Sequence, residues 1–209
     1  MQKYIDKNGL LKNIKQRKYL AIELGCGVKR KDDFLGIDRL DLEGVDIVSD
    51  LEEGLGFLPD DSVDLIKCKS FFEHIENFDM LILEIHRVLK KSGSLELFVP
   101  HFSNPYFYSD PTHKRYFGYY TFFYYANKNS IKNLYRKVPE FYGIKKFEIC
   151  SIKLTFGFYF PVIKHLFNLL EKIVNKKMIY QELYEVLFSS VIPCYGIKVV
   201  MKPVKSDLL

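Results

Sequence analysis

The first hundred residues alternate short apolar runs with one stretch of helical spacing. Five runs are bounded by glycine, proline or charged residues and predict buried strands, at 18–25, 34–39, 45–51, 63–69 and 94–100. Residues 77–90 show helical spacing instead, and their apolar face consists of Phe78, Leu81, Ile82, Ile85, Val88 and Leu89. Because the strands are apolar on both faces and joined by crossovers, the pattern indicates a parallel sheet covered by helices.

The pattern changes after Pro100. Residues 101–125 contain twelve Phe or Tyr and two His, and they follow neither the strand period nor the helix period. Beyond this aromatic segment, the pattern predicts two more strands, at 145–156 and 196–203. Two amphipathic helices are predicted between these strands, at 160–177 and 179–188.

The composition supports a single folded domain. The chain has 209 residues, of which 48% are apolar and 27% are charged, and these values are typical of a globular protein with a sizeable core. We expect one domain over 1–209, with an N-terminal extension at 1–17. We also expect a substrate-facing aromatic segment at 101–144 and a helical insertion at 160–190.

The cysteines and the apolar runs indicate the cellular compartment of the protein. Four cysteines lack the paired spacing of zinc sites and disulfide scaffolds, which fits a reducing compartment: Cys26, Cys68, Cys150 and Cys194. The N-terminus has no apolar signal-peptide core, and no apolar run reaches the length of about 18 residues that spans a membrane. We therefore expect a cytoplasmic protein.

A glycine turn ends the first predicted strand, in the string ELGCG at 23–27. Glycines let the backbone approach a ligand without an intervening Cβ, and nucleotides bind at this edge of a parallel sheet. The second strand ends in Asp38, which can accept hydrogen bonds from both hydroxyls of a ribose. The third ends in Asp50, which can accept from the exocyclic amine of adenine while the Leu51 backbone reads a ring nitrogen. A glycine turn alone often serves only close packing. A glycine turn followed by aspartates at the ends of the next two strands favours a nucleotide site.

Together with later segments, these motifs resemble those of a known family. ELGCG, GID, SDL, SFFEHI and EIHRVLKKSGSLELFVP are similar, in this order, to the motifs of class I methyltransferases that use S-adenosylmethionine. The resemblance covers roughly residues 18–125. It implies an α/β fold with a Rossmann-like, seven-stranded, mostly parallel sheet and an antiparallel last strand. The seven predicted strands match that count.

The resemblance also implies which residues hold the cofactor, S-adenosylmethionine. The glycine turn would surround its methionine part, Asp38 would hold the ribose, and Asp50 would hold the adenine. The full set of cofactor-binding candidates is Glu23, Gly25, Cys26, Gly27, Asp38, Asp50, Leu51, Ser70, Phe71 and His74. For His74, the middle residue of the string EHI, capping or a core hydrogen bond is the alternative.

The sequence departs from the family pattern in the first crossover. Lys29 stands where a third glycine is expected, and only 15 residues lead from Glu23 to Asp38. A full crossover needs about ten or more residues besides its turns, so the first helix must be short or replaced by the loop at 28–33. The same shortness disfavours an NAD-dependent oxidoreductase. Methyltransferases that look like glycan-modifying enzymes share this short segment and a string close to DPTH-x-R-x-F, here at 110–117.

The aromatic segment follows the fifth strand and should overhang the cofactor pocket. Methyl transfer from a sulfonium is an in-line displacement, and a general base helps an alcohol acceptor by about 10²–10⁴-fold. The catalytic candidates are His101, Asp110 and His113, because Pro111 stiffens a turn in which Asp110 and His113 can converge. Aromatic rings suit the face of a sugar. The alternative to this catalytic interpretation is that the segment is an ordinary turn beside aromatic residues of the core. We assign no residue as a metal ligand.

Charge is divided unevenly along the chain, whose net charge is +5. Residues 1–110 carry 15 basic and 20 acidic side chains, whereas residues 111–209 carry 16 and 6. The helices at 160–190 either pack on their own sheet or lay a lysine-flanked apolar face on a membrane. Basic charge also suits a phosphate-linked acceptor, or it only solvates the surface. Nucleic acid is not expected as a partner, because no binding motif occurs and the charge is not striped.

The motifs together predict an S-adenosylmethionine-dependent methyltransferase that modifies an oxygen of a glycan or another small molecule. Two alternatives stay open. One is methylation of a lipid or quinone by a protein at the inner face of a membrane. The other is a non-catalytic cofactor-binding or scaffold protein whose shortened loop has lost activity.

Overall fold

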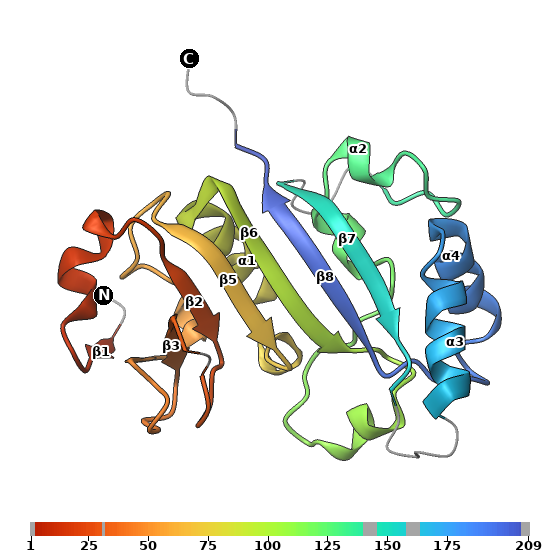
Figure 1. Cartoon of the computed structure of the whole chain (residues 1–209), viewed down its shortest axis with the longest axis horizontal. Helices are drawn as coiled ribbons and strands as arrows, with labels where there is room; N and C mark the ends of the chain where they lie inside the picture. Colours follow the sequence, from red (N-terminus) through yellow and green to blue (C-terminus); the bar gives the residue numbers. More distant parts are fainter. Residues whose placement is uncertain (1–2, 31, 140–145, 158–163, 206–209) are drawn as a thin grey trace.

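The strands form one eight-stranded sheet, in the order β1-β4-β3-β2-β5-β6-β8-β7 (Figure 1). This computed structural model describes residues 3–30, 32–139, 146–157 and 164–205. The strands are β1 (Tyr4–Asp6), β2 (Ala21–Leu24), β3 (Phe34–Asp38), β4 (Ile47–Ser49), β5 (Val63–Lys69), β6 (Leu89–Pro100), β7 (Phe147–Thr155) and β8 (Gly196–Pro203). The α-helices are α1 (Phe78–Val88), α2 (Lys128–Ile131), α3 (Lys164–Val174) and α4 (Met178–Leu187). The short 3₁₀-helices are η1 (Leu10–Gln16), η2 (Leu51–Glu53), η3 (Phe72–His74), η4 (Pro105–Ser109) and η5 (Thr121–Tyr125).

The centre of the sheet is parallel. The strands β4, β3, β2, β5 and β6 are neighbours and run the same way, and β8 inserts between β6 and β7, antiparallel to both. All seven predicted strands are present, and the mostly parallel Rossmann-like sheet with an antiparallel last strand is confirmed. The eighth strand, β1, pairs antiparallel with β4 inside the predicted N-terminal extension. Its three residues are too few to show a readable alternation.

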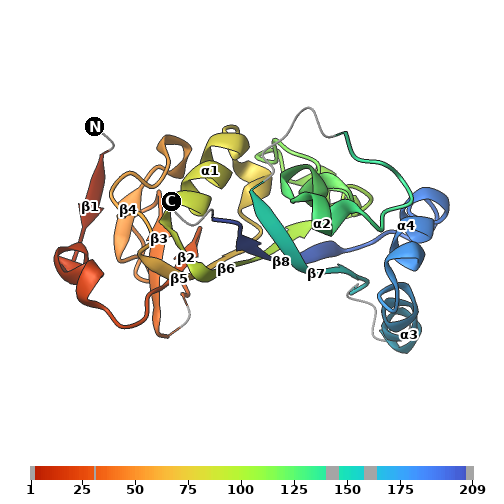
Figure 2. The ribbon, with the colours of Figure 1, turned by 90° about the horizontal axis from the view of Figure 1, so that it is seen from above.

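The connection from β2 to β3 is a loop, as the short spacing predicts, and its described residues form no helix. One face of the sheet centre consequently carries polar side chains, among them Lys67 and Glu96, whose ion pair measures 3.1 Å. The expectation that helices cover the sheet holds for the opposite face. There α1 and the aromatic segment lie across the strands (Figure 2).

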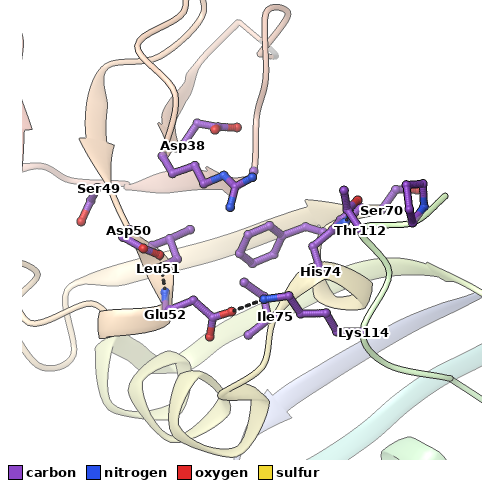
Figure 3. A pocket seen from close by; sticks show the side chains of 14 residues that line it. Asp38, Ser49, Asp50, Leu51, Glu52, Ser70, His74, Ile75, Thr112 and Lys114 are labelled. Carbon is purple, nitrogen blue, oxygen red and sulfur yellow. Dashed lines mark hydrogen bonds and ion pairs between the residues drawn. The ribbon is translucent and has the colours of Figure 1, made fainter.

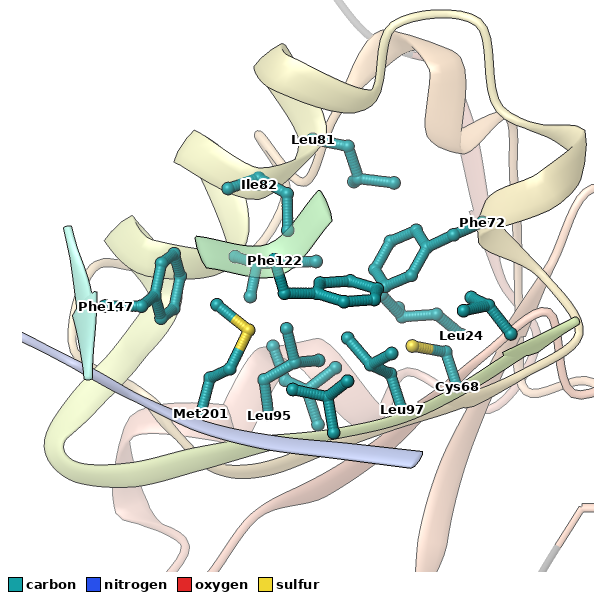
Figure 4. Close-up of a cluster of buried hydrophobic side chains, with 14 of the residues drawn as sticks. Leu24, Cys68, Phe72, Leu81, Ile82, Leu95, Leu97, Phe122, Phe147 and Met201 are labelled. Carbon is teal, nitrogen blue, oxygen red and sulfur yellow. The ribbon is translucent and has the colours of Figure 1, made fainter. Parts of the chain in front are cut away.

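The core lies between the sheet and α1, and rings from the aromatic segment complete it (Figure 4). The helix α1 turns its apolar face to the sheet, including Leu81 and Ile82. In the same layer, Phe117 and Phe122 stack with ring centroids 5.7 Å apart. Half of the twelve aromatic residues are buried: Phe107, Phe117, Tyr119, Tyr120, Phe122 and Phe123. Burying a ring of this size contributes about 1.5–3 kcal/mol, so the core interpretation is confirmed for these six.

The helices α3 and α4 lie along the free edge of β7 (Figure 1). The side chain of Asn175 donates to the carbonyl of Leu154 at 2.7 Å and accepts its N–H at 2.9 Å. These bonds satisfy backbone groups that an edge strand would otherwise expose. The helical insertion is confirmed for the described residues, whereas its predicted start at 160–163 lies outside them. Within the described ranges, no helix has both the length and the apolar character needed to cross a membrane.

Candidate active site

A cavity of about 440 Å³ opens where β2, β3, β4 and β5 end (Figure 3). The carboxyl ends of parallel strands meet at one edge of a sheet, which is where ligands bind in open α/β folds. Seven predicted cofactor residues line the cavity: Gly25, Asp38, Asp50, Leu51, Ser70, Phe71 and His74. The other lining residues are Arg39, Ser49, Glu52, Ile75, Pro111, Thr112 and Lys114.

Two left-handed residues shape the glycine turn after β2. Gly25 has a φ of 66° and Gly27 has a φ of 60°. A Cβ on Gly25 would lie 2.5 Å from the ring of Phe71, so only glycine fits this wall of the cavity. Gly27 is not among the described lining residues, but it donates its N–H to Asp38 Oδ2 at 3.0 Å. The turn therefore positions both a cavity wall and a carboxylate.

Asp38, the last residue of β3, presents an oriented carboxylate to the cavity. Its Oδ2 accepts the N–H of Gly27 and its Oδ1 accepts the N–H of Leu40, each at 3.0 Å. A carboxylate oxygen has two lone pairs, so each oxygen can accept a further hydrogen bond. A vicinal diol such as that of a ribose can donate to this carboxylate.

The short helix η2 forms another wall. Asp50 begins it by accepting the N–H of Glu52 at 3.0 Å, and Leu51 anchors it in the core. Glu52, which the sequence analysis missed, accepts the N–H groups of residues 76–77 at 2.7 and 2.9 Å. Its carboxylate also lies 3.8 Å from the ammonium of Lys114 (Figure 3). The only sequence signal for Glu52 was its position, two residues after the aspartate that ends the third predicted strand.

Ser70 turns the chain at the end of β5. Its φ of 50° lies in the left-handed region, which costs a residue other than glycine about 1–3 kcal/mol. The turn is held by the N–H of Ser70, which donates to the carbonyl of Phe98 at 2.9 Å. This geometry brings Ser70 and Phe71 to the cavity. Backbone strain of this kind is concentrated at functional sites.

Besides Gly27, two predicted cofactor residues are not among the described residues that line the cavity, namely Glu23 and Cys26. Glu23 lies within β2, opposite Gly36 of β3. Cys26 is buried, and its Sγ lies 3.7 Å from the carbonyl oxygen of Gly44. Burial, followed by the negative charges of Asp38 and Glu23, raises the pKa of the Cys26 thiol to about 12. The thiol is therefore a protonated packing group.

On the other side of the cavity, the lining residue His74 meets the imidazole of His113, which is not itself among the described lining residues. The rings of His74 and His113 lie edge to face with centroids 4.8 Å apart. The hydroxyl of Thr112 donates to Asp110 at 2.6 Å, so it accepts the Nδ1–H of His74 at 2.9 Å. His113 donates its Nδ1–H to the carbonyl of Phe107 at 2.8 Å. With Nδ1 as the donor, the neutral form of either ring carries its free electron pair on Nε2. Burial lowers the pKa of His74, which favours its neutral form.

The turn at 110–113 brings Asp110 and His113 together, with 3.7 Å between Oδ2 and Nε2. Asp110 Oδ1 accepts both the N–H and the hydroxyl of Thr112, and these bonds lower the pKa of its carboxyl group. The segment is fastened to η3 because the carbonyl of Glu73 accepts the N–H of Lys114 at 2.7 Å. The convergence expected from the Asp-Pro turn is present.

Glu73 is the functional candidate that the sequence analysis missed most clearly. It is 1% exposed, and its Oε2 has no hydrogen-bond partner among the described residues. Burial raises the pKa of its carboxyl group to about 7. One ligand-type atom from each of Glu73, His74 and His113 lies within 4.8 Å of the other two. The string EHI contained this signal, but only its histidine was considered.

A comparison with family models identifies the class of the domain. Residues 20–97, which supply the ends of β2 to β5, match the model of a family described as "Methyltransferase domain". The chain carries an S-adenosylmethionine-dependent methyltransferase domain. A comparison with curated proteins gives no match.

Solved methyltransferase structures share the fold. An S-adenosylmethionine-dependent methyltransferase from Archaeoglobus fulgidus is 21% identical, with a TM-score of 0.50 over 92% of this chain and 90% of that chain. One from Mesorhizobium loti is 12% identical, with a TM-score of 0.51 over 95% of this chain and 98% of that chain. At these identities the likeness concerns the fold, and it agrees with the sheet described above.

The cavity of the methyltransferase domain fits S-adenosylmethionine. Its volume of about 440 Å³ falls within the range of about 300–1,000 Å³ that is usual for cofactor sites. The missing Cβ of Gly25 makes room for the ring of Phe71 in one wall, while Asp38 and Asp50 place carboxylates at the ends of successive strands. When bound, the cofactor supplies a methyl group on a positively charged sulfur.

His101 lies away from the described lining of the cavity. It is fully buried, its Nε2 lies 2.7 Å from Glu185 of α4, and its Nδ1 lies 2.8 Å from the hydroxyl of Ser103. Glu185 also accepts the N–H of Tyr119 at 2.8 Å. These contacts join the aromatic segment to α4. We therefore give His101 a structural role and do not carry it forward as a base.

Proposed function

We propose that the methyltransferase holds its cofactor across the ends of four strands. The ribose hydroxyls donate to Asp38, and the adenine lies beside Asp50 on η2. The methionine part follows the turn at Gly25 toward Phe71. This orientation is supported by the close packing of the Phe71 ring on Gly25 and by the fixed carboxylate of Asp38. It leaves the side of the cavity at His74 for the acceptor.

We further propose that the acceptor is a hydroxyl group of a sugar or another small molecule. One observation carries this proposal. His74 and His113 each have a free electron pair on Nε2, and the carboxylate of Asp110 lies beside His113. An alcohol is a weak nucleophile until it loses its proton, so its methylation needs a nearby proton acceptor. The chain's part in the step is to take the hydroxyl proton on the Asp110–His113 pair. The acceptor oxygen gains the methyl group as the bond from that methyl to the sulfur breaks, and the leaving group is a neutral thioether.

Exposed rings beside His113 favour a sugar. Tyr108 and Tyr116 are 63% and 64% exposed, with ring centroids 6.0 Å apart. The ring of Phe107 lies 4.6 Å from that of His113 and 5.1 Å from that of Tyr116. We call Phe107, Tyr108 and Tyr116 the aromatic platform. The apolar face of a sugar ring packs well on such a surface, and the positive charge of residues 111–209 suits a phosphate-linked sugar.

The test is to identify the methylated product. The full chain is incubated with methyl-labelled cofactor and a panel of free, nucleotide-linked and polyprenyl-phosphate-linked sugars. We expect base-stable label on a sugar oxygen, and His113→Ala should lower kcat by about 100-fold or more without changing cofactor affinity. The control is His165→Ala, on an exposed position of α3. Label on nitrogen or sulfur would contradict the proposal, and unchanged turnover in His113→Ala would remove His113 from the step.

A lipid or quinone at a membrane surface is the second candidate acceptor. The helices α3 and α4 and the turn that follows leave apolar side chains exposed, including Leu166 at 64%, Val186 at 70% and Val191 at 76%. Among the described residues of α3, only Val174 is buried, and lysines such as Lys172 are exposed around this face. A lysine-flanked apolar face is typical of interfacial helices. Flotation with anionic liposomes tests this candidate, and Val186→Glu should abolish flotation.

A further inference from the structure

We infer that Glu73, His74 and His113 form a site for a divalent metal ion at the rim of the cofactor cavity. The ion's catalytic role rests on the proposed function, because it would bind the acceptor oxygen, but its binding does not. The three side chains come from η3 and from the 110–117 string, which are far apart in the sequence. Their ligand-type atoms nevertheless lie within 4.8 Å of one another.

Both imidazoles are already set as ligands. Histidines that bind metals almost always donate their second ring N–H to an oxygen, which fixes the tautomer and the orientation of the ring. Here His74 donates to the hydroxyl of Thr112 at 2.9 Å, and His113 donates to the carbonyl of Phe107 at 2.8 Å. The electron pairs available to a metal are consequently on the Nε2 atoms. The hydroxyl of Thr112 is held in turn by its hydrogen bond to Asp110 at 2.6 Å.

The third ligand is a buried carboxylate with an unsatisfied oxygen. Glu73 is 1% exposed, and its Oε2 has no hydrogen-bond partner in the described part of the chain. Burying an unpaired carboxylate oxygen is costly, so such an atom is normally bonded to a donor or a cation. A metal ion between Oε2 and the two imidazoles would satisfy it.

The donor set indicates the class of metal. Two imidazole nitrogens and one carboxylate oxygen suit Zn²⁺, Mn²⁺ or Fe²⁺, whereas Mg²⁺ and Ca²⁺ prefer oxygen ligands alone. Ligand atoms at about 2.0–2.2 Å from an ion lie about 3–4 Å from one another, so rotations that move them by about 1 Å would close the site. A site with three protein ligands keeps a coordination position open, as catalytic sites do.

The open position has a use in the proposed reaction. A hydroxyl oxygen bound to the ion loses its proton more readily, because the ion stabilises the alkoxide. With the Nε2 of His113 bound to the ion, Asp110 is the member of the Asp110–His113 pair that receives the proton, and its Oδ2 lies 3.7 Å from that Nε2. The nearby ammonium of Lys114 does not compete for the ligands, because it pairs with Glu76 at 2.8 Å.

The experiment measures metal binding without cofactor or acceptor. The full chain is stripped with a chelator and titrated with Co²⁺, followed by visible absorption, and with Zn²⁺ and Mn²⁺ by calorimetry. We expect one ion per chain. Losing an outer partner of a ligand costs about 10–100-fold in affinity, so Glu73→Gln and His113→Ala should each cost at least about 100-fold. The exposed His165→Ala should bind like the wild type. Absence of stoichiometric binding, or unchanged affinity in both ligand variants, would overturn the site.

A second variant keeps the test decisive if a ligand variant does not fold. Thr112→Val leaves all three ligands in place but removes the acceptor of the His74 Nδ1–H, so affinity should fall by about 10–100-fold. Affinity equal to wild type in Thr112→Val would contradict the geometry. The two proposals also fail separately. Base-stable sugar methylation without a bound ion would end only the metal proposal, and metal binding without sugar methylation would end only the proposed function.

Discussion

His113 donates its Nδ1–H to the carbonyl of Phe107 at 2.8 Å, so the Asp-Pro turn folds the chain back onto the residues just before it. This bond fixes the tautomer of His113 and directs its Nε2 to the side where Asp110 and His74 lie. It also places the imidazole against one ring of the aromatic platform. The chemistry proposed for the acceptor side therefore depends on a loop conformation as well as on residue types.

Replacing Asp38 by Ala should abolish tight cofactor binding and leave the fold intact. The variant loses a charged acceptor for the ribose hydroxyls, and hydrogen bonds to charged groups are worth about 1.5–3 kcal/mol each. We expect S-adenosylmethionine affinity to fall by at least about 30-fold by calorimetry. Asp41→Ala is the control, because Asp41 is exposed and pairs with Lys7 away from the cavity. Unchanged affinity in Asp38→Ala would refute the ribose assignment.

Two glycine substitutions should separate strain from space. Gly25→Ala places a Cβ 2.5 Å from the ring of Phe71 and also forces a left-handed φ on alanine. Gly27→Ala has the same backbone strain, but nothing lies within 4 Å of its Cβ. We expect Gly27→Ala to cost about 1–2 kcal/mol of unfolding free energy, and Gly25→Ala to cost more and to lose cofactor binding. Chemical denaturation and calorimetry measure the two effects. Equal effects on cofactor binding would show that the wall at Gly25 does not matter.

His101→Ala should lower stability rather than cofactor affinity. The substitution leaves Glu185, whose side chain is 10% exposed, without its imidazole partner, and a hydrogen bond to a charged group is worth about 1.5–3 kcal/mol. Denaturant unfolding should show this loss, while S-adenosylmethionine affinity of the folded fraction stays at the wild-type value. His86→Ala serves as the control, because its ring bonds to a single carbonyl, that of Val204. Wild-type stability combined with lost turnover would restore His101 as a catalytic candidate.

Tyr116→Ala should weaken acceptor binding. The exposed ring of Tyr116 contributes to the aromatic platform, and Tyr116 is not among the described residues that line the cavity. Aromatic contacts of this kind are worth about 0.5–1.5 kcal/mol beyond area burial, so KM for a sugar acceptor should rise by about 2–12-fold. Steady-state kinetics should show unchanged cofactor KM. Tyr135→Ala, at a position 83% exposed, is the matched control, and an equal rise there would argue against the platform.

The stability supplied by Glu84 should depend on pH. Its carboxylate accepts from Arg87 at 2.7 Å, and this bond lowers the pKa of Glu84 from 4.5, the value taken for the unfolded chain. Since the folded state favours the charged form, the stabilisation is present above that value and is lost as the pH falls through the lowered one. Unfolding free energies of wild type and Glu84→Gln should differ by up to about 1 kcal/mol at pH 7 and converge near pH 3. A difference in unfolding free energy that grows as the pH falls would contradict the predicted direction of the pH dependence.

Much of the cofactor side could be predicted because its residues are tied to strand ends. Parallel strands bring their carboxyl ends to one edge whatever the loops do, so Gly25, Asp38 and Asp50 meet there. Glu23 and Cys26 are not among the described lining residues, and their part in cofactor binding stays a prediction. Neighbouring residues of a strand or turn point to opposite sides, and periodicity alone does not say which side meets the ligand.

The acceptor side was decided by tertiary structure. By itself, the sequence determined the positions of seven strands, the acidic residues at the ends of two of them, and a turn that brings Asp110 near His113. It could not determine that Glu73 is buried beside His113, or that His101 faces Glu185, because those contacts join segments that only packing brings together. Local spacing fixes which residues end a strand or share a turn. Burial and partnership between distant segments depend on how the aromatic rings fill the core, and that is a property of the whole fold.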